Sequence, residues 1–246
     1  MTTPRKETGG PDRTPRSEIV PAVAASRKKE PVLLLDLSGS MDWSAEDEND
    51  ANGEWPSAAS RRAIVIAALP LLVKALAGQD TEAAAEQADG GDDLGGLLAF
   101  GFASEPVEIG DLNESNLTRR LNQIQWGGGT MIMPAWKLAL ADYDEEFGDR
   151  ELADQPTHLV LVVTDGQAQD FHAFSEVIGS ANSKRVIVVA IVGHGKAAVA
   201  TYQEYKAAAE KNTAADKFGK THVHVVLFDG VTDPQEIGED LATLAS

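Results

Sequence analysis

Side chains with oxygen atoms cluster in three short segments that lie far apart in the sequence. The segment DLSGS places Asp36, Ser38 and Ser40 at alternate positions. Thr130 follows three glycines in GGGT, and Asp165 lies in VVTDG. Carboxylates and hydroxyls are hard oxygen ligands, which suit Mg²⁺, Mn²⁺ or Ca²⁺ better than zinc. If the three segments meet, these five side chains form a site for one divalent cation.

The charges of this set indicate what such a site does. Two aspartates nearly neutralise a dication, while hydroxyls fill coordination positions without adding charge, so the ion keeps an open position. The glycines at 127–129 let their loop approach closely, because no side chain obstructs it. The alternative is purely structural: Ser38 and Ser40 cap the helix that follows, and the two aspartates merely end strands.

Apolar runs alternate with segments of helical spacing along most of the chain. The first run, VLLLDL from Val32, is typical of a strand covered on both faces. Further predicted strands are 94–102, 105–110, 157–166, 185–193 and 222–230. Predicted helices are 56–77, 115–124, 131–147, 171–182, 197–212 and 233–245. This alternation predicts a doubly wound α/β fold, with a mostly parallel six-stranded sheet and helices on both faces.

Local signals refine these elements. The run at 105–110 is short and polar, which predicts an antiparallel edge strand. Pro56 and Ser57 predict the start of the first long helix, and Pro70 predicts a kink or break near Leu69. Four apolar residues at helical spacing predict one buried stripe; they are Trp136, Leu140, Tyr143 and Phe147.

Ligands of open α/β sheets lie beyond the carboxyl ends of the parallel strands. The predicted strands that end near Asp36 and Asp165 deliver both carboxylates to that edge. The GGGT loop is expected at the same edge. The fold prediction and the predicted cation site therefore agree on one location.

The segments DLSGS, GGGT and TDG resemble the metal-ion-dependent adhesion site of von Willebrand factor A domains, over about residues 30–246. The resemblance implies that domain's fold and one Mg²⁺, with Asp165 acting through water. It also implies that a carboxylate from a partner protein fills the open position. The chain is more similar to stand-alone bacterial members, some of which accompany tellurite-resistance and stress-response systems.

Composition narrows the class of partner. The formal net charge is −18, although residues 1–30 hold seven basic and four acidic residues. A protein with this large excess of negative charge repels nucleic acid and anionic lipid. We therefore expect neither as a partner.

The chain has no cysteine, which favours a reducing compartment. Because the first residues also lack an apolar stretch typical of a signal peptide or anchor, we expect a cytoplasmic protein.

We expect residues 1–28 to be a disordered tail and 29–246 to be the von Willebrand factor A domain. The loop at 42–55 is unusually acidic, with six Asp or Glu and no basic residue. It selects the partner, binds Ca²⁺ (although its spacing does not match that of an EF-hand), or is simply solvated. Trp43, Trp55 and Trp126 fall near the same rim, where they either anchor a partner or pack the loop onto the domain.

The leading interpretation is a non-enzymatic, Mg²⁺-dependent module that binds an Asp or Glu of a partner protein, with Mn²⁺ or Ca²⁺ as possible substitutes. One alternative is a Mg²⁺-assisted hydrolase or phosphatase with Asp36 as nucleophile. Such enzymes place a second aspartate where this chain has Ser38. Another alternative is a scaffold protein whose metal is purely structural. The sequence does not identify the partner, the pathway or the oligomeric state.

Overall fold

The computed structural model describes residues 28–45, 60–77, 96–166, 168–215 and 221–246. All of the expected tail except its last residue, most of the acidic loop and Trp55 therefore lie outside the described residues. The strands are β1 (Lys29–Asp36), β2 (Leu97–Phe102), β3 (Pro106–Leu112), β4 (Thr157–Thr164), β5 (Arg185–Gly193) and β6 (Val223–Asp229). The helices are η1 (Gly39–Asp42, a short 3₁₀ helix), α1 (Arg61–Ala77), α3 (Leu117–Gln123), α4 (Ile132–Phe147), α5 (Phe171–Gly179), α6 (Gly195–Ala215) and α7 (Pro234–Ala245).

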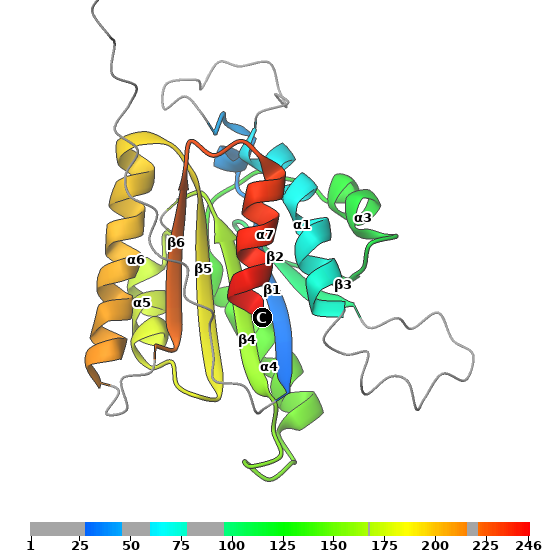
Figure 1. Cartoon of the computed structure of the whole chain (residues 1–246), viewed down its shortest axis with the longest axis vertical. Coiled ribbons are helices and arrows are strands. Elements are labelled where there is room, and N and C mark those ends of the chain that lie inside the picture. The colour runs from blue at the N-terminus through cyan, green and yellow to red at the C-terminus, as the bar shows by residue number, and fades with distance from the viewer. Residues whose placement is uncertain (1–27, 46–59, 78–95, 167, 216–220) are drawn as a thin grey trace, which may run out of the picture.

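The six strands form one sheet in the order β3-β2-β1-β4-β5-β6 (Figure 1). All neighbouring strands are parallel except β3, which pairs antiparallel with β2 at the edge of the sheet. The predicted α/β fold, with its antiparallel edge strand, is thus confirmed. The central strands β1, β4 and β5 are apolar along most of their length, as expected for strands covered by helices on both faces.

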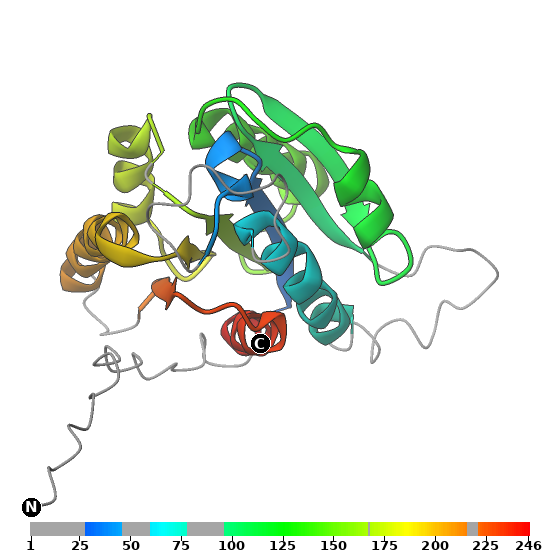
Figure 2. The same cartoon turned by 90° about the horizontal axis from the view of Figure 1, so that it is seen from above.

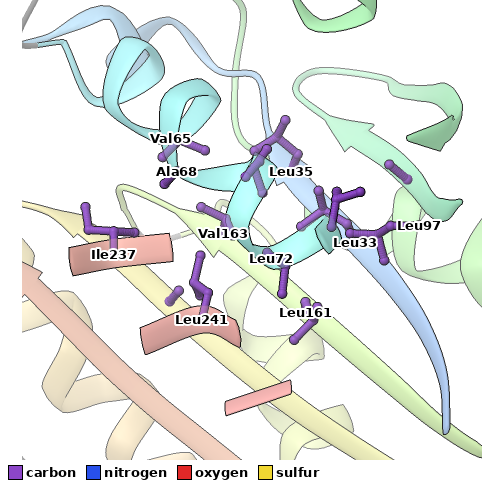
Figure 3. Close-up of a cluster of buried hydrophobic side chains, with 14 of the residues drawn as sticks. Leu33, Leu35, Val65, Ala68, Leu72, Leu97, Leu161, Val163, Ile237 and Leu241 are labelled. Atoms are coloured by element: carbon purple, nitrogen blue, oxygen red, sulfur yellow. The ribbon is translucent and has the colours of Figure 1, made fainter. Parts of the chain in front are cut away.

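Helices cover the two faces of the sheet and enclose two apolar cores, because successive side chains of a strand point to opposite faces. Leu33 and Leu35 of β1 pack in the core beneath α1 and α7, whereas Val32 and Leu34 pack in the core beneath α4, α5 and α6. Figure 2 shows helices on either side of the sheet, and Figure 3 shows the first core, where α1 and α7 meet β1 and β4.

The predicted stripe of α4 is confirmed as the buried side of the helix. Trp136 lies in the second core, Leu140 packs against that core while partly exposed, and Tyr143 and Phe147 are also buried. Trp136 also meets Phe174 of α5 edge to face, with ring centroids 5.7 Å apart. These contacts fix α4, which directly follows the GGGT loop, against the sheet.

The expected start of the first long helix was wrong, and of the kink or break expected near Leu69 the break does not occur. The helix begins at Arg61 rather than near Pro56, and the Ser60 hydroxyl accepts a 3.1 Å hydrogen bond from Ala63 N in its first turn. It also continues through Pro70 to Ala77 without a break at Leu69. The apolar face of α1, packed against α7 and the sheet, outweighs the local cost of proline.

No helix in the described part of the chain combines the length and apolar character needed to cross a membrane.

Candidate metal centre

The candidate site lies where the strand order of the sheet reverses. From β1 the chain moves to β2 and β3 on one side, and then to β4, β5 and β6 on the other. Asp36 ends β1 and Asp165 directly follows β4, the neighbouring parallel strand. Such a switch point is the usual ligand position in doubly wound sheets. Figure 1 shows η1 beyond the end of β1 at this edge.

Asp36 is held rigidly at the tip of β1. Its carboxylate is completely buried, with an exposed fraction of 0%. Ser38 N donates a 2.8 Å hydrogen bond to Oδ1, and the Thr164 hydroxyl donates a 2.6 Å hydrogen bond to Oδ2. The first bond curls the chain back toward the strand, and the second ties β1 to the end of β4.

Ser38, Ser40 and Asp165 form a continuous chain of polar contacts beside Asp36. The Ser38 and Ser40 hydroxyl oxygens lie 3.1 Å apart, and Ser40 Oγ donates a 3.0 Å hydrogen bond to Asp165 Oδ1. The structure therefore brings together four of the five residues predicted for the site. Because these groups come from segments more than a hundred residues apart, only the fold can place them side by side.

The structure also argues against capping as the main role of Ser38. Ser38 occupies the N-cap position of η1, yet its side chain makes no capping hydrogen bond there. Its hydroxyl instead faces that of Ser40. The alternative, in which Ser38 only caps the following helix, therefore does not account for the position of its hydroxyl.

The GGGT loop lies directly against the tip of β1. Gly127 N donates a 2.7 Å hydrogen bond to Leu37 O, and Gly39 N lies 3.4 Å from its acceptor Gly128 O. Gly128 has φ +92°, and a Cβ atom there would lie 2.8 Å from Ser104 Oγ, so this position requires glycine. The predicted close approach of the loop is thus observed.

Thr130 differs from the other four predicted site residues in its hydrogen bonds. Its carbonyl accepts a 2.7 Å hydrogen bond from Gln169 N, which links the loop to the segment after β4. Among the residues that the structure describes, no hydrogen bond joins the Thr130 hydroxyl to the other four. Thr130 therefore lies in the adjacent loop, and in the described residues its hydroxyl is not hydrogen-bonded to Asp36, Ser38, Ser40 or Asp165.

The oxygen donors of the site are of the type that binds a hard cation, and one of the two carboxylates, that of Asp165, is paired with Arg61. Burial, followed by the nearby Asp165 carboxylate, raises the pKa of Asp36 to about 6. Two carboxylates that repel each other next to uncharged hydroxyls are the donor set expected for a hard dication. Among the described residues, no group of three or more His, Cys, Asp or Glu could hold a metal ion, so a site here depends on the hydroxyls as well as the two aspartates. The donor types present, carboxylates and neutral hydroxyls, are those that Mg²⁺ accepts.

Two residues of the site were not predicted from the sequence. The sequence predicts only that Thr164 lies in a strand, whereas in the structure its hydroxyl donates a hydrogen bond to Asp36. Arg61 was assigned only to a helix, yet its Nη1 lies 2.5 Å from Asp165 Oδ2. A hydroxyl beside the TDG aspartate was a usable signal for Thr164. No sequence signal distinguishes Arg61 from the adjacent Arg62.

The rim tryptophans differ in their environment. Trp43 is exposed at 42% and lies beside Arg61, whose Cζ is 5.9 Å from the ring centroid. Trp126 packs against the first core and donates a 3.0 Å hydrogen bond from Nε1 to Leu121 O. Of the two, only Trp43 therefore presents a large apolar surface next to the site.

Comparisons with known proteins find likeness in structure but not in sequence. No family model and no curated protein matches the chain. A von Willebrand factor type A structure from Catenulispora acidiphila matches with a TM-score of 0.52 and 14% identity, over 90% of this chain and 42% of that one. The SpRpn10 VWA domain matches with a TM-score of 0.53 and 10% identity, over 88% of this chain and 94% of that one.

A third match, the PilB minor pilin from Streptococcus sanguinis, has a TM-score of 0.54 and 10% identity, over 91% of this chain and 63% of the pilin. The chain thus spans less than two thirds of the pilin and of the Catenulispora structure, but nearly all of the SpRpn10 domain. Identities this low establish architecture alone. These matches cover most of the chain with TM-scores above 0.5, and the chain therefore has the fold of von Willebrand factor A domains.

Proposed function

We propose that this chain is a non-enzymatic protein-binding module that recognises a carboxylate of a partner protein through a Mg²⁺-dependent site. The observation that carries the proposal is the hydrogen-bonded set of Asp36, Ser38, Ser40 and Asp165 at the switch point of the sheet. These residues and Thr130 would hold the ion. The ion would supply positive charge and an open coordination position for an anionic group.

The residues of the chain have separate tasks in this proposal. Asp36, fixed by Ser38 N and Thr164, is the rigid anionic anchor. The serine hydroxyls add oxygen ligands without adding charge, which leaves the ion electrophilic. A strongly acidic protein can then still recognise an acidic side chain, because the local charge at the site is that of the ion.

The residue at position 38 favours binding over the hydrolase alternative. Enzymes with an aspartyl nucleophile place a second aspartate there, whereas this chain has Ser38, whose hydroxyl faces that of Ser40. A scaffold with a purely structural metal is the other alternative. It differs in its consequence, because metal removal would then lower stability without changing partner affinity.

Affinity capture from the native cell tests the proposal. The immobilised chain is compared with and without EDTA, and with the Asp36→Ala and Asp229→Asn variants. Asp229 is the matched control, because it is a carboxylate at the end of another parallel strand, β6. We expect one partner to be lost with EDTA and with Asp36→Ala, and retained by Asp229→Asn.

Identification of the captured protein allows the second half of the test. Replacement of one Asp or Glu of that partner by its amide is expected to abolish binding. Partner recovery that is insensitive to EDTA and to Asp36→Ala would contradict the proposal. Tellurite-resistance and stress-response systems are the first places to look for the partner, given the sequence resemblance to their stand-alone domains.

A further inference from the structure

Arg61 places a positive charge inside the candidate metal centre. Its Nη1 lies 2.5 Å from Asp165 Oδ2, and the exposed fractions of the two side chains are 10% and 2%. The same nitrogen lies 3.5 Å from Ser40 O. The guanidinium therefore contacts two of the residues predicted to surround the ion, from the side of α1.

The fold encloses this arginine instead of leaving it at the surface. Arg61 N donates a 3.0 Å hydrogen bond to Trp43 O, which fixes the start of α1 against the end of η1. A Cβ atom built on Gly193, at the end of β5, would lie 3.9 Å from Arg61 Cζ. Arg61 Nε is buried without a hydrogen-bond partner. A guanidinium so enclosed needs a nearby anion, and Asp165 supplies it.

The ion pair between Arg61 and Asp165 reduces the net negative charge that the site offers to a metal ion. Two carboxylates alone would offer a dication nearly full neutralisation, but Arg61 already compensates one of them. Arg61 also repels any cation that approaches Asp165, because like charges in a shielded site interact strongly. The neighbouring Arg62 has a different environment, since it lies over the ring of Trp126 and 3.5 Å from Asp42.

We propose that Arg61 is a built-in counter-cation of the site, which pairs with Asp165 and thereby weakens the affinity of the site for a divalent cation. Asp165 is then held by the chain itself rather than drawn fully onto the ion. The ion keeps more of its charge for an external carboxylate. Arg61 is a positioning residue in this account, and the inference rests on the proposed metal-dependent function.

Titration with MgCl₂ by isothermal calorimetry tests this role on the full chain. Arg61→Gln removes the charge, Arg61→Met removes it while filling similar space, and Arg61→Lys retains it. Arg62→Gln is the matched control, because it removes the same charge from the adjacent position. We expect Arg61→Gln and Arg61→Met to bind Mg²⁺ at least about tenfold more tightly than the wild type.

The control variants separate this effect from general damage to the fold. Arg61→Lys and Arg62→Gln are expected to stay within about threefold of the wild-type affinity, because screening weakens more distant charges. A merely structural role of Arg61 predicts weaker Mg²⁺ binding in every Arg61 variant. Measuring two uncharged variants keeps the test valid if one of them does not fold, which circular dichroism will show.

The outcomes distinguish this inference from the proposed function. If the wild type binds Mg²⁺ and the uncharged variants bind it equally or more weakly, the role of Arg61 is wrong and the proposed site stands. If the uncharged variants bind Mg²⁺ and the wild type does not, Arg61 acts as inferred and the wild-type site is not metal-dependent. Absence of binding in all variants overturns both.

Discussion

Thr164 Oγ1 lies 2.6 Å from Asp36 Oδ2 and donates a hydrogen bond that joins the ends of β4 and β1. Both residues are buried, so the bond is shielded from water. Hydrogen bonds to an ionised acceptor are stronger than those between neutral groups. Thr164 thus fixes the orientation of the carboxylate that anchors the candidate site.

Thr164→Val removes this bond with little change in shape. We expect a loss of about 1–3 kcal/mol in the free energy of unfolding, because a buried carboxylate oxygen loses its donor. We also expect weaker Mg²⁺ binding, since Asp36 is no longer oriented. Urea unfolding measures the change in stability, and metal titration measures the change in Mg²⁺ affinity.

Thr157→Val is the control at the opposite end of β4, where the hydroxyl makes a longer 3.4 Å bond to Ser183 O. Equal losses in both variants would contradict the special role of Thr164.

Trp43 is expected to contribute to partner binding rather than to stability. It is exposed beside the site, as aromatic anchors of interfaces are before binding. Trp43→Ala should weaken the affinity for the captured partner at least about tenfold, with little change in melting temperature. Leu152→Ala is the control, because Leu152 is also exposed but precedes β4 at the far end of the sheet. An unchanged affinity in Trp43→Ala would exclude this anchor.

The contact between α1 and α7 requires a glycine at position 238. A Cβ atom there would lie 2.6 Å from Ala68 O, which is backbone and cannot move aside freely. We expect Gly238→Ala to cost about 1–3 kcal/mol of unfolding free energy. Gly179→Ala is the matched helical control, because a Cβ atom there meets nothing within 4 Å. That variant should be neutral or slightly stabilising. Destabilisation of similar size in both would refute the packing argument.

His158 makes the stability of the fold depend on pH. Burial, followed by the charge of Arg185, lowers the pKa of His158 from 6.5 to about 3. Its ring stacks on Tyr143, with centroids 4.4 Å apart. Between these two pKa values the unfolded chain binds a proton that the folded chain does not. Stability is therefore retained above pH 6.5 and is lost as the pH falls toward 3.

The contribution of His158 approaches about 1.4 kcal/mol per pH unit well below pH 6.5. We expect His158→Gln to flatten the dependence of unfolding free energy on pH between about pH 7 and pH 5, measured by urea unfolding. His172→Gln is the control, because the side chain of His172 is 92% exposed. If His158→Gln retains the wild-type slope, another group is responsible for the dependence.

The sequence was sufficient to predict the sheet and the location of the candidate site. Continuous apolar runs predict buried parallel strands, and a carboxylate at the end of such a run must lie at the ligand edge. This reasoning places Asp36 and Asp165 together without any knowledge of tertiary contacts. It also predicts the approach of the GGGT loop, in which Gly127 and Gly128 both have the positive φ that glycine adopts readily while they bond to the backbone at the tip of β1.

The remaining features depend on how the helices pack. Burial of Arg61 follows from the position of α1 relative to η1 and β5, which no local pattern in the sequence reveals. The helix start was misplaced because Pro56 and Ser57 are a typical start signal, whereas Ser60 occupies that role in the structure. The roles predicted for the acidic loop and Trp55 stay predictions, since these residues lie outside the described part of the chain.

Direct calorimetric titration of the wild-type chain with MgCl₂ is the most decisive measurement, alongside Asp36→Ala and Asp229→Asn. We predict saturable binding of one ion by the wild type and by Asp229→Asn, and none by Asp36→Ala with its fold retained. Absence of binding by the wild type, or undiminished binding by Asp36→Ala, would contradict the assignment of this sheet edge as a metal centre.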